Sequence, residues 1–208
     1  MNSQKYFDEV AGQWEDMRQN FFPDSLRDTA LTAAGTQADQ VAADIGAGTG
    51  FITSALVEAG VRVIAVDQSA EMLAEMKRRF SAMESIEYRV GEAENLPLAD
   101  GEADHTFANM YLHHVENPAI SIKEMARILK SGGKLVITDV DEHEHQFLLQ
   151  EHHDRWPGFK REEVARWFTE AGLTDVSVNG TNDNCRASSE SGTDRADISI
   201  FIAIGAKA

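Results

Sequence analysis

The chain has 208 residues, which is enough for one well-buried α/β domain and too short for two comfortable ones. Its 19 Lys and Arg residues against 35 Asp and Glu residues give a net charge of −16. Nucleic-acid affinity depends largely on basic side chains that neutralise phosphates. We therefore expect a small-molecule partner and no nucleic-acid partner.

Membrane and secretory features are not expected either. No apolar run approaches the roughly 20 residues that span a bilayer. The N-terminal segment MNSQKYFDEVAG lacks the basic region and apolar core of a signal peptide. The single cysteine, Cys185, fits a reducing compartment. The sequence predicts a cytoplasmic protein, and it leaves the oligomeric state open.

Residues 1–35 are predicted to form helices that lie ahead of a sheet, as a helical cover, with residues 36–208 forming the main part of a single structural domain. From residue 41 onward, short apolar strands alternate with amphipathic helices. The alternation predicts crossover units and a largely parallel sheet. The expected strands are residues 41–46, 61–67, 86–91, 103–111 and 134–140.

The end of the chain breaks this alternation. Helices are expected after Asn117-Pro118, ending at Gly132-Gly133, and around residues 164–171. Residues 176–180 and 198–205 then form two strands with no helix between them, and residues 181–197 read as a loop. Two such strands must run antiparallel. The predicted fold class is α/β, a doubly wound, Rossmann-like sheet that is mostly parallel with an antiparallel C-terminal strand.

A glycine loop follows the first strand in VAADIGAGTG. Glycines permit positive φ and a close approach of the backbone to a ligand, and ligands of open parallel sheets lie at the carboxyl ends of the strands. The spacing is G-x-G-x-G, whereas a dinucleotide site needs G-x-G-x-x-G or A, and Phe51 stands at that last position. No Lys-Ser/Thr pair follows, which argues against a phosphate-binding P-loop.

The second strand, VIAVD, ends in Asp67, 17 residues after Gly50. A carboxylate at this position can accept hydrogen bonds from both hydroxyls of an adenosine ribose. The alternative is that Asp67 only caps the helix that begins near Ser69.

With these motifs the sequence resembles the class I S-adenosylmethionine-dependent methyltransferases, in the small-molecule group that includes quinone-biosynthesis enzymes. DIGAGTG and VIAVDQS resemble the family's first two motifs, and GEAENLPLADGEADHTF, NMYLHHVENP and ILKSGGKLVITD resemble later ones. The resemblance implies a strand order of 3-2-1-4-5-7-6, S-adenosyl-L-methionine as cofactor and S-adenosyl-L-homocysteine as product. It assigns cofactor binding to Asp44, Gly46, Ala47, Gly48, Gly50, Asp67, Gln68, Glu92, Ala93, Glu94, Asn109 and Met110.

Histidines concentrate after the fourth and fifth strands, at the sheet edge where an acceptor would bind. Methyl transfer from a sulfonium needs mainly alignment, and a base only if the nucleophile arrives protonated. We predict His114 and His145 as catalytic candidates. Histidines in acidic loops can also be merely solvated, packed or capping. Further candidates for contact with the acceptor are Tyr6, Trp14, His113 and His143.

The same histidine-rich region also suggests a metal site and an arsenic-related function. The order H-E-H followed by H-H-D suggests metal ligands, but the spacing matches no compact metal signature, and no resident metal is expected. The segment from Asp141 to Leu173 resembles the methyltransferase half of ArsR-type fusion proteins. Arsenite methyltransferases rely on several cysteines, and the single Cys185 argues against arsenite. Cys185 is expected in a loop at the active-site side.

Three alternatives stay open at this point. A nucleic-acid or protein methyltransferase of the same fold is disfavoured because Asn109-Met110-Tyr111-Leu112 lacks an Asn/Asp-Pro-Pro-Tyr motif. A cofactor-binding protein without transferase activity is compatible with every motif. A nicotinamide-dependent oxidoreductase is disfavoured by Phe51 and by the antiparallel end of the chain.

Overall fold

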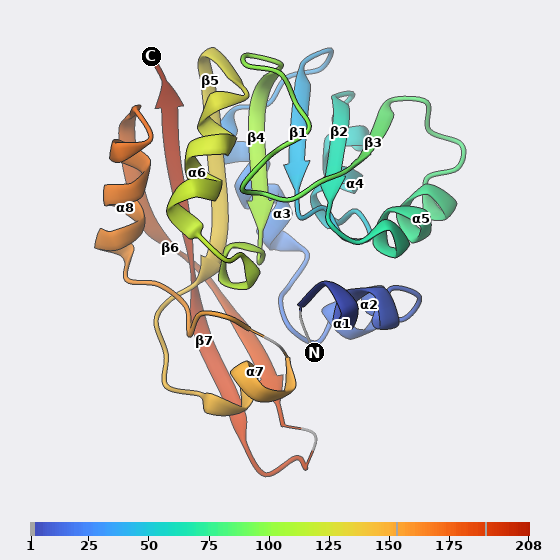
Figure 1. Ribbon diagram of the computed structural model, residues 1–208, viewed down its shortest axis with the longest axis vertical. Helices are drawn as coiled ribbons and strands as arrows, with labels where there is room; N and C mark the ends of the chain where they lie inside the picture. The colour runs from blue at the N-terminus through green and yellow to red at the C-terminus, as the bar shows by residue number, and fades with distance from the viewer. Residues whose placement is uncertain (1–2, 153, 190) are drawn as a thin grey trace.

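The central element is a mixed seven-stranded sheet with the order β3-β2-β1-β4-β5-β7-β6 (Figure 1). The computed structural model describes residues 3–152, 154–189 and 191–208, so His153 lies outside the described residues. The first five strands are parallel, and β7 pairs antiparallel with both β5 and β6. The predicted fold class and strand order are confirmed. The strands are β1 (Val41–Ile45), β2 (Arg62–Asp67), β3 (Ile86–Val90), β4 (Ala103–Asn109), β5 (Leu129–Val140), β6 (Leu173–Ser188) and β7 (Arg195–Lys207).

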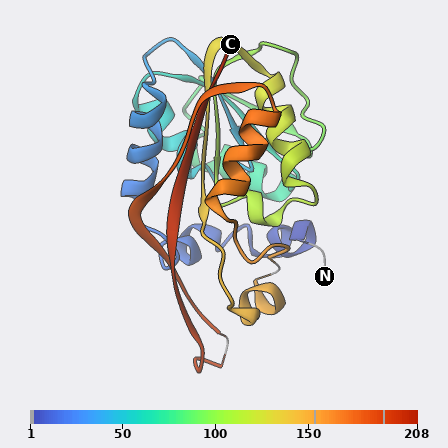
Figure 2. The same ribbon diagram turned by 90° about the vertical axis from the view of Figure 1, so that its left-hand side faces the viewer.

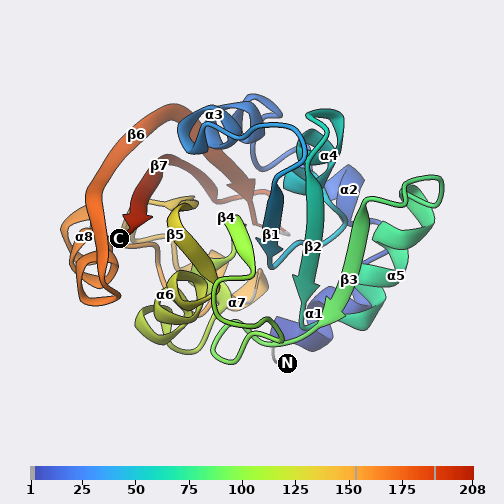
Figure 3. The same ribbon diagram turned by 90° about the horizontal axis from the view of Figure 1, so that it is seen from above.

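Helices cover both faces of the sheet (Figures 2 and 3). One face buries an apolar layer against α3, α4 and α5, and the opposite face buries a second layer against α6 and α8. This is the layering that right-handed crossovers produce in a doubly wound sheet. The helices are α1 (Ser3–Val10), α2 (Trp14–Arg18), α3 (Ser25–Ala34), α4 (Phe51–Glu58), α5 (Ala70–Arg79), α6 (Pro118–Arg127), α7 (Gln146–Glu151) and α8 (Arg161–Glu170), with a 3-10 turn at Leu112–His114.

The carboxyl ends of the parallel strands meet at the lower edge of the sheet in Figure 1, and α1, α2 and α7 lie below that edge. The N-terminal helices predicted for residues 1–35 are present as α1, α2 and α3, but only α3 packs on the sheet face. Among the described residues, no helix has the length and apolar character that crossing a bilayer requires.

The prediction of a loop at residues 181–197 is wrong. β6 continues to Ser188 and β7 begins at Arg195, so the two strands form a long hairpin that extends beyond the sheet (Figure 2). Cys185 and Ala187 point inward and are buried, while Arg186 and Ser188, which alternate with them, are exposed. This period-two alternation was hidden because the inward side chains are small and the outward ones are polar, which is typical of loop composition.

β5 begins at Leu129, five residues before the predicted start of the strand at residue 134. The helix before it ends at Arg127, and Leu129 already pairs with Ala103 of β4. The ladder then shifts register before Lys134 pairs with His105. Gly132, with φ +79°, lies inside this irregularity and does not end the helix. The glycine pair therefore marks a bulge, which tolerates positive φ, rather than a helix stop.

Candidate active site

The glycine loop between β1 and α4 adopts the backbone conformation that its glycines allow. Gly46, Gly48 and Gly50 have φ of +67°, +54° and +96°. The amides of Gly46 and Ala47 both donate to the carbonyl oxygen of Val66, at 2.9 and 3.0 Å. These bonds hold the loop against the carboxyl end of β2. The loop itself follows β1, and the strand order reverses between β1 and β4, which is where open α/β sheets bind ligands.

Asp67 ties this loop to the start of α5. Its carboxylate accepts hydrogen bonds from the amides of Gly48, at 2.8 Å, and Ser69, at 2.9 Å. The capping role is taken by Ser69, whose hydroxyl accepts from the amide of Met72 at 3.1 Å. Burial raises the pKa of Asp67 to about 6, with a further contribution from the charge of Asp8 and against the hydrogen bonds that it accepts. Because a buried carboxylate has little contact with water, hydrogen bonds from ligand hydroxyls would stabilise it.

A cavity of about 540 Å³ opens beside the loop and Asp67. Its walls come from the glycine loop, the ends of β2 and β4, and the helical cover. Seven of the residues predicted for cofactor binding line it: Gly46, Ala47, Gly48, Asp67, Gln68, Asn109 and Met110.

Asp44 and Gly50 are placed behind the cavity wall. The buried Asp44 carboxylate accepts from both the amide of Thr53, at 3.0 Å, and its hydroxyl, at 2.7 Å. Burial raises the pKa of Asp44 to about 6, and the nearby Asp67 charge adds to this. A side chain on Gly50 would meet the ring of Phe80 at 2.6 Å. Both residues shape the loop from behind and do not line the cavity.

The three acidic-segment residues predicted beside the adenine do not line the cavity. Ala93 is buried in the core. The Glu94 carboxylate accepts from the amides of Glu116 and Asn117, at 2.9 and 3.0 Å, so it fixes the loop before α6. Glu92 lies in an isolated bridge with Asn95. A direct contact of Glu92, Ala93 or Glu94 with the cofactor stays a prediction.

Tyr111 was missed as a candidate at the sequence level. A Cβ atom on Gly46 would lie 2.2 Å from Cγ of Tyr111, so the tyrosine ring packs directly on the glycine. Burial raises the pKa of its hydroxyl, and the charges of Asp67 and Glu94 add to the shift. Met110, just before it, has φ +50°, a backbone conformation that non-glycine residues rarely adopt.

A second cavity, of about 560 Å³, adjoins the first. It is walled by the helical cover, the turn after β4, the segment after β5 and the β6–β7 hairpin. The four residues predicted to contact the acceptor, Tyr6, Trp14, His113 and His143, all line it. The two cavities share the lining residues Phe7, Trp14, Phe22, Met110 and His114.

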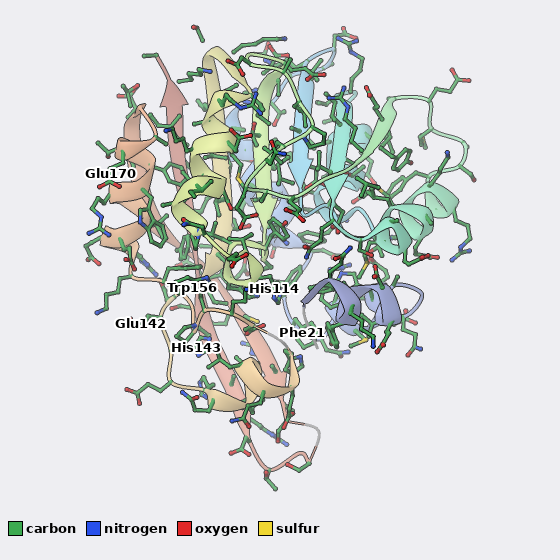
Figure 4. The ribbon with its side chains drawn as sticks, viewed as in Figure 1. Phe21, His114, Glu142, His143, Trp156 and Glu170 are labelled. Carbon is green, nitrogen blue, oxygen red and sulfur yellow. The ribbon has the colours of Figure 1, made fainter. Side chains whose placement is uncertain are left out.

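The two predicted catalytic histidines are placed differently. His114 is buried and lines both cavities, with its ring 5.0 Å from that of Phe7 in an edge contact. Figure 4 shows His114 and His143 on the same side of the sheet, beyond the carboxyl ends of the strands. His145 lines neither cavity. Its ring lies 5.6 Å from that of His143 in a tilted contact and 6.1 Å from that of Phe147 in an edge contact.

His113 forms a buried pair with Asp139 at the end of β5, with 2.6 Å between Nδ1 and Oδ1. Burial alone would lower the pKa of His113, but the carboxylates of Asp139 and Asp154 outweigh it and raise the pKa to about 9. His143 behaves in the opposite way, because burial and the neighbouring His145 and His113 lower its pKa to about 4. The two imidazoles therefore differ in charge at neutral pH, because His113 keeps its proton and His143 does not.

Cys185 lies in β6, not in a loop as expected, and its side chain lines the second cavity. Burial raises the pKa of its thiol to about 12, and the charges of Asp154 and Asp139 add to the shift. A thiol held protonated in this way is a poor nucleophile. Cys185 acts as a small wall residue.

The helical cover is attached to the cofactor side by polar contacts. The Ser69 hydroxyl donates to Asp8 at 2.6 Å. Glu15 accepts from the Thr49 hydroxyl at 3.1 Å and pairs with Arg79 at 2.8 Å. The aromatic residues of the cover close the space above the glycine loop, where Trp14 Nε1 lies 3.6 Å from the Cβ position of Gly48.

Known proteins with similar sequences include methyltransferases. A family model described as a methyltransferase domain matches residues 43–137. The demethylmenaquinone methyltransferase of Paenarthrobacter aurescens is 30% identical over 179 residues, which cover 73% of this chain and 69% of that protein. The chain belongs to the S-adenosylmethionine-dependent methyltransferases.

One further sequence relative is a methyltransferase, and one solved structure shares the fold. The chloroplastic 2-methyl-6-phytyl-1,4-hydroquinone methyltransferase of Arabidopsis thaliana is 31% identical, over 74% of this chain and 46% of that protein. A Haloferax volcanii methyltransferase, solved in complex with the Trm112 methyltransferase activator, has the same fold, with a TM-score of 0.80, 22% identity and coverage of 99% and 97% of the two chains. The chain spans about half the length of most curated relatives that it matches.

Cofactor affinity of this methyltransferase should depend on pH through Asp67. The carboxylate can accept both ribose hydroxyls only when ionised, and its pKa is about 6. As pH falls below that value, we expect the affinity for S-adenosylhomocysteine to fall about tenfold per pH unit. Calorimetric titration between pH 5 and pH 8 measures this. In Asp67→Asn the dependence should disappear, and its persistence would assign the titration to the neighbouring Asp44 instead.

Proposed function

We propose that this methyltransferase transfers the methyl group of S-adenosylmethionine to a small, largely apolar acceptor. The observation that carries the proposal is that the cofactor cavity and the aromatic second cavity adjoin and share five lining residues, Phe7, Trp14, Phe22, Met110 and His114. The cofactor's methyl group would then lie at the boundary of the two cavities.

The cofactor is held by the residues of the first cavity. Asp67 accepts the ribose hydroxyls, the glycine loop passes close to the methionine part, and Asn109 and Met110 contact its end. Asn109 is held for this task because its side-chain oxygen accepts from the Thr138 hydroxyl at 2.7 Å.

The acceptor lies in the second cavity. Tyr6, Trp14 and other aromatic side chains surround its apolar part. The C–S bond of the sulfonium breaks as the bond from the acceptor to the methyl carbon forms, and sulfur keeps the electron pair. Because the leaving thioether is neutral, alignment supplies most of the rate. The names of the quinone-related relatives favour an aromatic diol or quinol as acceptor class.

Nucleic-acid acceptors are disfavoured by the net charge of −16 and by the narrow apolar cavity. A cofactor-binding protein without transferase activity would need no second cavity next to the first. On its composition, with a single cysteine, we place the reaction in the cytoplasm.

Transfer of labelled methyl from S-adenosylmethionine to a panel of quinols, phenols and aromatic amines tests the proposal. We expect saturable turnover with at least one apolar aromatic acceptor. Tight cofactor binding without turnover on any member of the panel would favour the binding-protein alternative, and absence of cofactor binding would overturn the proposal.

His114 is the residue that we propose to act on the reacting group of the acceptor. It lines both cavities, whereas His145 lines neither. We expect His114→Gln to lower kcat by 10²- to 10⁴-fold, the usual range for loss of a positioned acid–base group, with cofactor affinity changed less than threefold. His145→Gln is the matched comparison and should cost much less. Equal losses in the two variants would remove the special role of His114.

A further inference from the structure

Two imidazoles and one carboxylate from distant parts of the chain meet in the wall of the second cavity. His113 and His114 belong to the turn after β4, and Asp154 follows α7. Asp154 Oδ1 lies 3.8 Å from His113 Nε2 and 3.8 Å from His114 Nδ1. The three ligand atoms lie within 4.8 Å of one another, and all three side chains are at most 8% exposed.

A fourth residue orients the first imidazole. Asp139 lies at the end of β5 with its side chain fully buried, and its Oδ1 is 2.6 Å from Nδ1 of His113. Proteins that bind metal through histidine almost always pair the other ring nitrogen with a carboxylate, a carbonyl or a water in this way. The bond fixes the ring and leaves Nε2, the atom nearest Asp154, available as a ligand.

The donor set selects the kind of ion. Two imidazole nitrogens and one carboxylate oxygen suit zinc and neighbouring transition metals, whereas magnesium and calcium favour oxygen ligands. Tetrahedral zinc with bonds near 2.1 Å separates its ligand atoms by about 3.4 Å. The two 3.8 Å separations lie within a few tenths of an ångström of that value. The two imidazole nitrogens lie within 4.8 Å of each other, so rotation of the side chains has to bring this third pair closer as well.

We propose that His113, His114 and Asp154 bind one divalent transition-metal ion, zinc first among them, with its fourth position open to the acceptor cavity. Three protein ligands and one open position are the arrangement of catalytic zinc sites. Two carboxylates, Asp139 and Asp154, are buried beside His113, and an ion bound here would displace the proton that His113 carries in their field. His143, whose Nε2 is buried without a hydrogen-bond partner in the described part of the chain, lines the same cavity.

The part of this inference that concerns catalysis rests on the proposed function. A metal at this place would bind an oxygen of the acceptor and hold it beside the methyl group. His114 would then act on the acceptor as a ligand of the ion rather than as a base. The sequence expectation of no metal was based on the spacing of His143, His145 and the H-H-D segment, and the structure draws its ligands from a different pair of histidines.

Metal binding is tested without cofactor or acceptor. Protein purified without a histidine tag is dialysed against a chelator, and Zn²⁺ is titrated back by calorimetry and elemental analysis. We expect one equivalent of Zn²⁺ per chain. Co²⁺ in place of Zn²⁺ should give visible d–d absorption of the strength typical of four-coordinate sites, a readout from the unmodified protein that no folding defect can obscure.

Variants then assign the ligands. Asp154→Asn and His114→Gln should each weaken Zn²⁺ binding at least 100-fold, and Asp139→Asn should weaken it 10- to 100-fold, as expected for an orienting carboxylate. His145→Gln, outside the ligand set, should bind Zn²⁺ like the parent protein. S-adenosylhomocysteine titration of each variant confirms that the fold is intact.

The absence of a Co²⁺ spectrum in the parent protein overturns the proposal. So does Zn²⁺ binding that Asp154→Asn and His114→Gln leave unchanged, since the ion would then be bound elsewhere. Normal S-adenosylhomocysteine binding in either case leaves the proposed methyltransferase function standing.

Discussion

Asp67→Ala is expected to weaken S-adenosylhomocysteine binding by about 100-fold or more. In the proposed function Asp67 accepts hydrogen bonds from two ribose hydroxyls, which the variant would lose, and each bond to a charged group contributes about 1.5–3 kcal/mol. The variant also removes the acceptor of the hydrogen bonds that the amides of Gly48 and Ser69 donate to Asp67, at 2.8 and 2.9 Å. Calorimetric titration gives the dissociation constant directly.

Two companion variants separate ligand binding from folding. Asp67→Asn keeps the side-chain volume and one acceptor oxygen, so it should show a smaller loss of affinity and a melting temperature close to that of the parent. Asp8→Asn removes a neighbouring charge without removing the ribose acceptor. A dissociation constant for Asp67→Ala within threefold of the parent value would show that the ribose is held elsewhere.

Gly46→Ala should have a comparably large effect on cofactor binding. The new Cβ atom would lie 2.2 Å from Cγ of Tyr111, and the residue would keep a φ of +67° that alanine adopts only with strain. The ring must leave its place, and the loop must shift where it passes closest to the cofactor. We expect at least 100-fold weaker binding of S-adenosylhomocysteine.

The clash and the backbone strain can be separated. Gly132 has a similar φ of +79° but nothing within 4 Å of its Cβ position, so Gly132→Ala carries the strain alone. It should lower stability by about 1 kcal/mol and leave cofactor affinity unchanged. Adding Tyr111→Ala to Gly46→Ala should recover part of the lost affinity. No recovery would show that the loop backbone, not the ring, is responsible.

Much of the cofactor side was predictable because its signals are local. The glycines at 46, 48 and 50 need positive φ, and the structure has it at all three. Asp67 closes an apolar strand, so its place at the carboxyl edge follows from the alternation of strands and helices. Asp44 shows the limit of this reasoning, because a motif position does not reveal that a carboxylate turns inward to Thr53.

The acceptor side was predictable only in part. One cavity is lined by all four residues predicted to contact the acceptor, Tyr6, Trp14, His113 and His143. The prediction was possible because the ends of the parallel strands and the helical cover meet at one edge of the sheet. Asp154 was considered only as part of the H-H-D segment, and Asp139 was not singled out, because nothing in its neighbourhood distinguishes it from the other acidic residues of an acidic chain. Their importance arises from contact with His113, which lies 26 residues before Asp139.

In the β6–β7 hairpin, one strand was predictable from local sequence and the other was not. The period-two isoleucines of β7 identified that strand by themselves, and Ile200 and Phe201 are fully buried as expected. The partner segment around Cys185 has polar composition, and its strand conformation comes from pairing with β7. The sequence by itself therefore determined the sheet, the glycine loop and Asp67, because backbone conformation and apolar periodicity are local properties. Only the tertiary structure decided which histidines and carboxylates share the acceptor cavity, because that depends on distances between segments far apart along the chain.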